Sequence, residues 1–193
     1  MQANPILQVR VARKCAEAQD ICSLELVPLD GQSLPAFTAG SHIDLHLPGG
    51  LVRQYSLCND PQDTGRYVVG VLREAASRGG SAAVHEQVQE GQQIAIGAPR
   101  NHFALDEDAA HTVLVAGGIG VTPIVCMARR LAERGRSFTL LYCARSRAEA
   151  AFVEQLSAYG DAVRFHFDDE AGVPPDLNAM LAGQEATTHF YCC

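Results

Sequence analysis

Residues Thr112 to Pro123 read TVLVAGGIGVTP, and this stretch decides the fold of the second half of the chain. The continuous β-branched run at its start is typical of a strand buried on both faces of a parallel sheet. The glycines that follow let a pyrophosphate or a ribose approach the backbone, and Pro123 suits the first turn of a helix. Because no Gly-Lys-Ser/Thr sequence follows, the turn is not a Walker A loop, and it predicts a dinucleotide-binding turn.

Downstream of this turn, helical and strand-like segments alternate. The expected helices cover residues 123–134, 146–159 and 176–181, and the expected strands cover residues 138–143, 163–167 and 189–193. This order predicts a parallel, doubly wound α/β sheet. The last residues form an apolar run with no turn or helix after it, so we expect the natural protein to continue beyond Cys193.

Upstream of the turn, short alternating runs are separated by Gly, Pro, Asn and Asp. We expect six strands, over residues 7–12, 21–27, 42–47, 52–57, 67–73 and 94–98, and one helix over residues 81–89. This spacing predicts an antiparallel barrel or sandwich. We place the boundary near residues 99–107, which gives expected domains over 1–103 and 104–193.

The composition describes a soluble globular protein, with 47% hydrophobic and 19% charged residues among 193 and a net charge of −7. An acidic chain is a poor nucleic-acid binder, because phosphate binding needs a basic surface. No basic segment followed by an apolar stretch precedes the first expected strand, so we expect no signal peptide. The uncharged stretch 112–128 contains three glycines and a proline, so it does not predict a membrane helix. We therefore expect a cytoplasmic protein, and we expect a monomer.

The chain has seven cysteines and no C-x-x-C pair, which favours free thiols in a reducing compartment over a metal site. His42 and His46 share one strand face, but no third metal ligand is close to them in the sequence. We expect no metal site within this chain.

Two short motifs of the first half indicate a phosphate ester. Arg53, Tyr55 and Ser56 of the run RQYSL could bind a phosphate, stack on a flat ring and bond a ring heteroatom, respectively. Arg78-Gly79-Gly80-Ser81 precedes the expected helix and would place helix N–H groups against an anion. Taken singly, the motifs could also be an ordinary barrel strand and an ordinary helix cap. Together they favour a binding platform.

The order R-x-Y-S-L, R-G-G-S, G-G-I-G-V-T-P and Y-C-C resembles the ferredoxin-reductase-like flavoproteins. The likeness is greatest to the phthalate dioxygenase reductase and vanillate demethylase reductase branch, which Ala98-Pro99-Arg100-Asn101-His102-Phe103 also resembles. The resemblance extends over nearly the whole chain. It implies a Greek-key barrel that holds flavin, as FMN in this branch, followed by an NAD(P)-binding domain.

The resemblance also implies roles for particular residues. Thr122 and Cys193 are the expected catalytic residues beside the hydride-transfer site. The expected cofactor-binding residues are Arg53, Gln54, Tyr55, Ser56, Gly70, Val71, Leu72, Gly79, Gly80, Ser81, Gly117, Gly118, Gly120, Thr122, Arg145 and Arg147. The family's ferredoxin domain with its [2Fe–2S] cluster is absent from this chain and is expected downstream.

The choice between NADH and NADPH depends on the segment after the second strand of the α/β half. Arg145 and Arg147 could bind a 2′-phosphate and favour NADPH, or they could be a solvated pair at a helix start. The branch usually uses NADH, so we expect NADH with some use of NADPH.

Hydride transfer between stacked nicotinamide and flavin rings needs no general base, and no catalytic triad or carboxylate pair is present. We therefore expect a reductase that moves hydride from NAD(P)H to FMN and passes single electrons, through a [2Fe–2S] domain, to a Rieske-type oxygenase. Two alternatives remain open: a freestanding NAD(P)H:flavin or ferric reductase, and a flavin-binding regulatory module without turnover.

Overall fold

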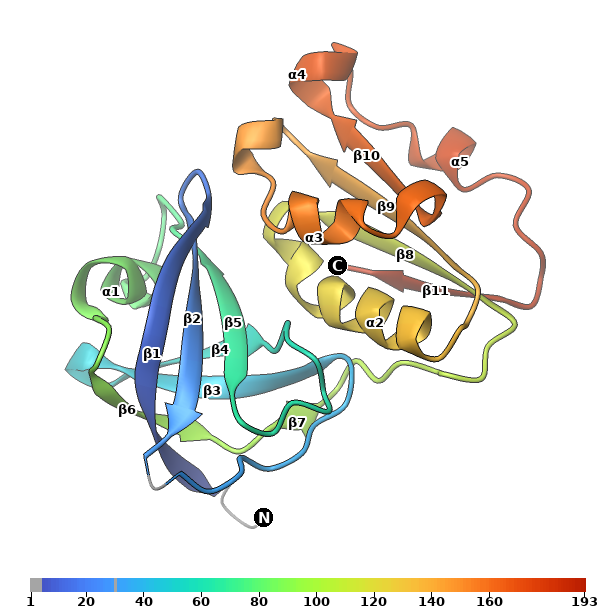
Figure 1. Cartoon of the computed structure of the whole chain (residues 1–193). Coiled ribbons are helices and arrows are strands. Elements are labelled where there is room, and N and C mark those ends of the chain that lie inside the picture. Colours follow the sequence, from blue (N-terminus) through green and yellow to red (C-terminus); the bar gives the residue numbers. More distant parts are fainter. Residues whose placement is uncertain (1–4, 30) are drawn as a thin grey trace.

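The first half of the chain folds into an antiparallel barrel in the computed structural model, which describes residues 5–29 and 31–193 (Figure 1). The strands run in the order β4-β3-β6-β1-β2-β5, with β7 paired to β3. A bridge between Leu57 and Val69 joins the end of β4 to β5 and closes the barrel. The strands are β1 (Ile6–Ala18), β2 (Ile21–Pro28), β3 (Ser41–Leu47), β4 (Leu51–Ser56), β5 (Tyr67–Leu72), β6 (Gln93–Gly97) and β7 (Arg100–Asn101).

Alternation of side chains creates the barrel core. In β3, Ile43, Leu45 and Leu47 are buried, while the residues between them are only partly covered. This period of two is what a strand with one face in the core produces. The one helix described between β5 and β6 is α1 (Gly80–Gln87), whose Ala83 and Val84 pack into the same core.

The second half is a parallel sheet in the order β10-β9-β8-β11. Its strands are β8 (His111–Gly117), β9 (Phe138–Ala144), β10 (Val163–Phe167) and β11 (Thr188–Cys192). Its helices are α2 (Val121–Glu133), α3 (Val153–Ser157), α4 (Asp168–Ala171) and α5 (Leu177–Met180). The central strand β8 is buried from Thr112 to Ala116, as its β-branched run predicts. The fold class, an antiparallel barrel followed by a parallel α/β sheet, is confirmed.

The predicted helix over residues 146–159 is wrong as one continuous helix. The segment contains a 3₁₀ turn at Arg147–Glu149 and the short helix α3, separated by Phe152 at a φ of 61°. Ala150 and Ala151 between them are buried. Packing of this link against the molecule therefore overrides the local helical preference of the sequence. Two short elements, β7 and α4, were not predicted at all.

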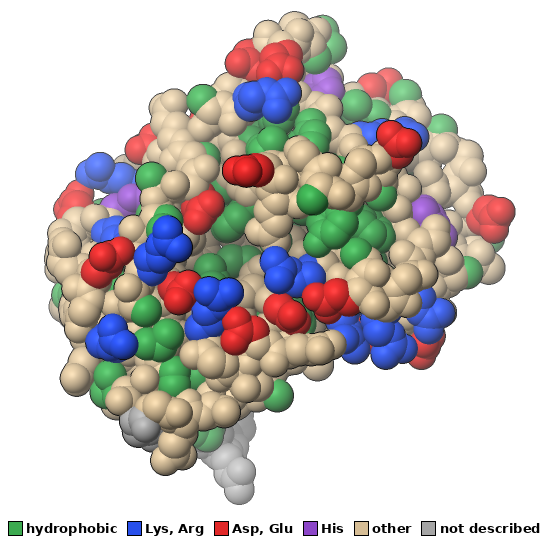
Figure 2. Space-filling model, viewed as in Figure 1, with side chains coloured by type: hydrophobic (Ala, Val, Ile, Leu, Met, Phe, Trp, Pro, Cys, Tyr) green, Lys and Arg blue, Asp and Glu red, His purple; other side chains and the backbone are tan. Residues whose placement is uncertain are grey.

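The surface carries charged side chains of both signs, as the composition of the chain predicts. Acidic and basic side chains are interspersed over the face shown in Figure 2. Among residues 5–29 and 31–193, no helix has both the length and the apolar character needed to cross a bilayer.

Candidate functional site

The start of α1 lies directly against Arg53. Gly79 precedes the helix with a φ of 89°, in the left-handed region that favours glycine. A Cβ placed on Gly80 would lie 2.6 Å from both Cγ and Nε of Arg53, so a larger residue there would displace the arginine side chain. The Arg53 guanidinium donates to the carbonyls of Val52, at 2.8 Å, and Arg78, at 3.1 Å. A guanidinium and the N–H groups of a helix N-terminus therefore converge, as anion binding requires.

Ser81 completes the first turn of this cradle. Its side chain is buried, and its Oγ accepts a hydrogen bond from the Glu74 main-chain N–H at 3.1 Å. The hydroxyl proton is still available for an acceptor, because a serine hydroxyl both accepts and donates. We call Arg53, Gly79, Gly80 and Ser81 the α1 cradle.

The next residues of β4 extend the site from the cradle. Tyr55 is half-buried, and burial raises the pKa of its phenol, with the Arg53 charge acting in the opposite direction. Gln54 and Ser56 line a cleft of about 340 Å³ together with Pro123 and Cys193. The alternating strand thus presents its residues to two different surroundings, because neighbouring side chains point to opposite faces.

The barrel meets the α/β half at Gly70. A Cβ on this residue of β5 would lie 2.8 Å from Cγ2 of Thr122 and 3.4 Å from the Phe152 ring. Thr122 is buried, and its hydroxyl donates to the Ile119 carbonyl at 3.1 Å. Val71, next along β5, is buried in the barrel core. Gly70 therefore brings the strand and the start of α2 together.

The glycine-rich turn lies beside the end of β11. The Gly117 N–H donates to the Cys193 carbonyl at 2.8 Å, and the Cys193 N–H donates to the Val115 carbonyl at 3.0 Å. A Cβ on Gly120 would overlap the Cys193 main chain. Burial, and then the neighbouring Cys192, raises the pKa of the Cys193 thiol.

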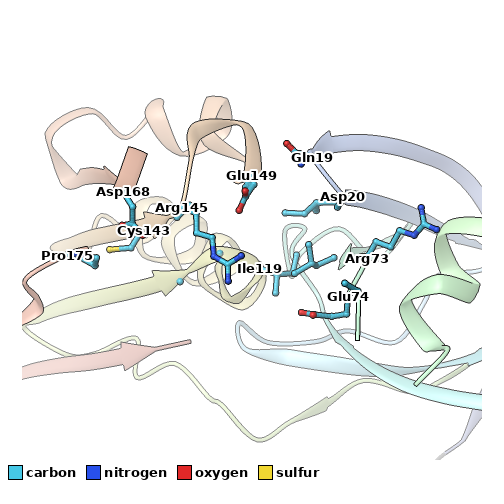
Figure 3. A pocket seen from close by; sticks show the side chains of 16 residues that line it. Gln19, Asp20, Arg73, Glu74, Ile119, Cys143, Arg145, Glu149, Asp168 and Pro175 are labelled. Carbon is cyan, nitrogen blue, oxygen red and sulfur yellow. The ribbon is translucent and has the colours of Figure 1, made fainter. Parts of the chain in front are cut away.

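A large cleft with a volume of about 590 Å³ lies between the two halves (Figure 3). One wall is formed by the β1–β2 hairpin and the end of β5, and the other by the turn after β8 and the end of β9. The predicted residues that line it are Leu72, Gly117, Gly118 and Arg145. A cleft at the carboxyl ends of parallel strands is where α/β sheets bind ligands.

The two arginines after β9 differ in their surroundings. Arg145 reaches into the cleft toward Ile119 (Figure 3), and no carboxylate among residues 5–29 and 31–193 pairs with it. Arg147 instead donates from Nε to Glu170 Oε1 at 3.0 Å, and its Cζ lies 4.5 Å from the centre of the Phe167 ring. It does not line the cleft. Only one of the two predicted arginines faces a ligand space.

Sequence reasoning missed several residues of the large cleft. Gln19 and Asp20 come from the β1–β2 hairpin, and Glu149 and Asp168 come from the α/β half (Figure 3). Asp20 carries a turn signal, but no pattern in the sequence shows that this hairpin faces the second half. Within the described residues, no group of three or more His, Cys, Asp or Glu side chains could hold a metal ion.

Comparisons with known proteins agree with this geometry. No family model matches the chain. The vanillate O-demethylase oxidoreductase of Pseudomonas putida is 51% identical over 92% of this chain and 56% of its own length. The phthalate dioxygenase reductase of Burkholderia cepacia is 39% identical over 100% of this chain and 61% of its own length. A solved phthalate dioxygenase reductase superimposes with a TM-score of 0.93 at 38% identity, over 97% of this chain and 60% of that one.

The barrel, the α/β sheet and these relatives together confirm the predicted resemblance: this chain is similar to the ferredoxin-reductase-like flavoproteins. Within that class, the relatives reported above are a vanillate O-demethylase oxidoreductase and a phthalate dioxygenase reductase, which is the branch that the sequence predicts. The chain spans 56% to 61% of the length of the two curated relatives.

Proposed function

We propose that this chain is the flavin- and nucleotide-binding part of an NAD(P)H-dependent reductase. Residues 1–103 would form the flavin domain and residues 104–193 the nucleotide domain. The observation that carries the proposal is the Gly70–Thr122 contact and the large cleft between the two halves, together with strand β4, which joins the α1 cradle to the second cleft, where Gln54 and Ser56 lie beside Pro123 and Cys193. A flavin could thus be held on the barrel and a pyridine nucleotide on the α/β half.

The residues fit FMN in their donor chemistry. The α1 cradle offers a guanidinium and helix N–H groups to a phosphate, and Tyr55 and Ser56 follow on the same strand. When bound, FMN supplies a hydride acceptor that can release its electrons one at a time. Thr122, at the contact with Gly70, and Cys193, whose main chain lies against Gly120, would border the place of hydride transfer.

We further propose that electrons pass through a [2Fe–2S] ferredoxin domain to a Rieske-type oxygenase. The solved relative is described as a modular structure for electron transfer from pyridine nucleotides to [2Fe–2S], and the curated relatives are longer than this chain. The relatives' names refer to a demethylase and a dioxygenase, which supports an oxygenase as the partner. All seven cysteines are free thiols, which supports a cytoplasmic location.

Anaerobic addition of NADH tests this function. The flavin-loaded protein should lose its visible flavin absorbance, because hydride is transferred to the bound cofactor. The measurement is stopped-flow absorbance with the full-length protein, and the same protein mixed with buffer that lacks NADH is the control. A protein that binds FMN but keeps it oxidised through many NADH additions would be a regulatory module and would refute the reductase assignment.

We propose NADH as the preferred nucleotide, with some use of NADPH. Of the two predicted arginines, only Arg145 lines the cleft and could bind a 2′-phosphate, while Glu149 and Asp168 of the same cleft would repel that phosphate. Arg145→Ala should lower kcat/KM for NADPH about tenfold and change the NADH value little, since a charged hydrogen bond contributes about 1.5–3 kcal/mol. Arg147→Ala is the matched control and should leave both values near the parent's. Equal losses with both nucleotides after Arg145→Ala would contradict the assignment.

A further inference from the structure

Lys14 is the only lysine among the 15 basic residues of the chain. Its ammonium donates to three main-chain carbonyls, those of Val84 at 2.9 Å, His85 at 2.8 Å and Val88 at 2.9 Å. An ammonium has three donors around one nitrogen, so it can satisfy three converging carbonyls. A planar guanidinium presents its donors in a fixed fork and does not match this arrangement. The three bonds thus use a property that the chain's arginines lack.

These three carbonyls lie at the C-terminal end of α1. A helix of eight residues is marginal by itself, and its last carbonyls have no partner within the helix. Lys14, from strand β1, satisfies them and places a positive charge where the helix dipole favours one. His85 adds a second connection, because its Nε2 lies 2.9 Å from the Val71 carbonyl of β5. The C-terminal end of α1 is therefore attached to two barrel strands.

The opposite end of α1 forms the α1 cradle. Its N–H groups can bind a phosphate only while the helix is formed, and Gly80 lies close to Arg53, where a Cβ would be 2.6 Å from Cγ and Nε. Lys14 lies at the far end of the helix and donates only to that end. Lys14 can therefore affect a ligand of the cradle only by keeping helix α1 folded and in place.

We propose that Lys14 is a positioning residue for the flavin phosphate: its three bonds hold α1 so that the cradle keeps its geometry. The inference rests on the proposed function, because it needs FMN as the ligand of the cradle. Riboflavin has the same ring and ribityl chain without the phosphate. The ratio of the riboflavin Kd to the FMN Kd therefore isolates the phosphate interaction from all other effects on the flavin site.

The experiment measures this ratio by flavin fluorescence for the parent, Lys14→Met and the control Arg10→Met, which changes an exposed cation of the same strand. The parent should prefer FMN. Lys14→Met should lower the preference about tenfold, the size expected when a charged hydrogen-bond partner is lost. Its riboflavin Kd should stay within about twofold, the usual scatter between independent sites. Arg10→Met should keep the full preference.

The outcomes separate the two ideas. A parent that binds riboflavin as well as FMN would refute the phosphate cradle and the role of Lys14 together. A parent that prefers FMN, with an equal preference in Lys14→Met, would refute the role of Lys14 alone.

If Lys14→Met does not fold, the native chain still provides a test. Ligand binding and helix order are reciprocal, so FMN should slow acetylation of Lys14 by an amine-reactive ester, and riboflavin should slow it less. Mass spectrometry of the Lys14 peptide reports the rate. Equal rates with and without FMN would overturn the proposal.

Discussion

Arg53→Ala is expected to release FMN from an otherwise folded protein. Removing the guanidinium should raise the Kd for FMN roughly 10- to 100-fold, because a charged hydrogen bond contributes about 1.5–3 kcal/mol. The riboflavin Kd should change far less, since the lost contact is to the phosphate. Near-ultraviolet circular dichroism checks the fold, and fluorescence titration at low and high salt measures the affinities. The parent's FMN affinity should fall with salt, and the variant's should depend on salt much less.

Two further variants make this result specific. Arg53→Lys keeps a charge but loses the fork that donates to the Arg78 carbonyl at 3.1 Å, so its FMN affinity should lie between those of the parent and Arg53→Ala. Arg10→Ala removes an exposed arginine elsewhere on the barrel and should leave binding unchanged. Full retention of FMN by Arg53→Ala would remove the phosphate role from this residue.

Most of the sheet architecture could be predicted because its signals are local. Strand β10 was predicted over 163–167 and is Val163–Phe167, since its β-branched and aromatic residues lie between clear turns. Strand β1 was predicted over 7–12, but it continues to Ala18. Register shifts between Val11 and Arg13 and between Ala16 and Ala18 interrupt the alternation there, so a period of two could not reveal the strand.

The helix expected over 146–159 shows the limit of local reasoning. Its composition favours a helix, but Phe152 lies with a φ of 61° and packs near Gly70 of the barrel. A contact between two halves of the chain decides this backbone, and no periodicity within 146–159 contains it. The prediction of the residues that line the large cleft was incomplete for the same reason, because Gln19 and Asp20 belong to the barrel half of the chain.

The residues of the α1 cradle were easier to predict than Lys14, which holds the opposite end of α1. Arg53 and the Gly79-Gly80-Ser81 turn belong to motifs with a recognisable chemistry, and the structure brings them together. Their roles as cofactor ligands remain predictions. Lys14 lies outside every motif, and its only signal is that the chain uses arginine at all its other basic positions. That signal acquires a meaning only when the three carbonyls of α1 are seen around its ammonium.

Gly118→Val is expected to slow reduction by NADH without loss of flavin. Gly118 has a φ of 51° in the turn after β8 and lines the large cleft. Left-handed backbone costs an L-residue about 1–2 kcal/mol, and a β-branched side chain tolerates it worst. The turn should therefore shift away from its nucleotide-binding shape, and the valine side chain would also narrow the cleft. Because the strain acts on nucleotide binding, the KM for NADH should rise about tenfold or more, as measured by the dependence of the reduction rate on NADH concentration.

Gly135→Val is the control that separates general backbone strain from a local effect on the nucleotide-binding turn. Gly135 also has a positive φ, 61°, no atom lies within 4 Å of a Cβ built there, and it follows α2 away from the large cleft. Both variants carry the same kind of backbone strain in the same half of the chain, so both should lower the thermal midpoint. Only Gly118→Val should change KM for NADH. If Gly135→Val raises KM to the same extent, the effect is general destabilisation, and the turn after β8 loses its assignment as the nucleotide-binding turn.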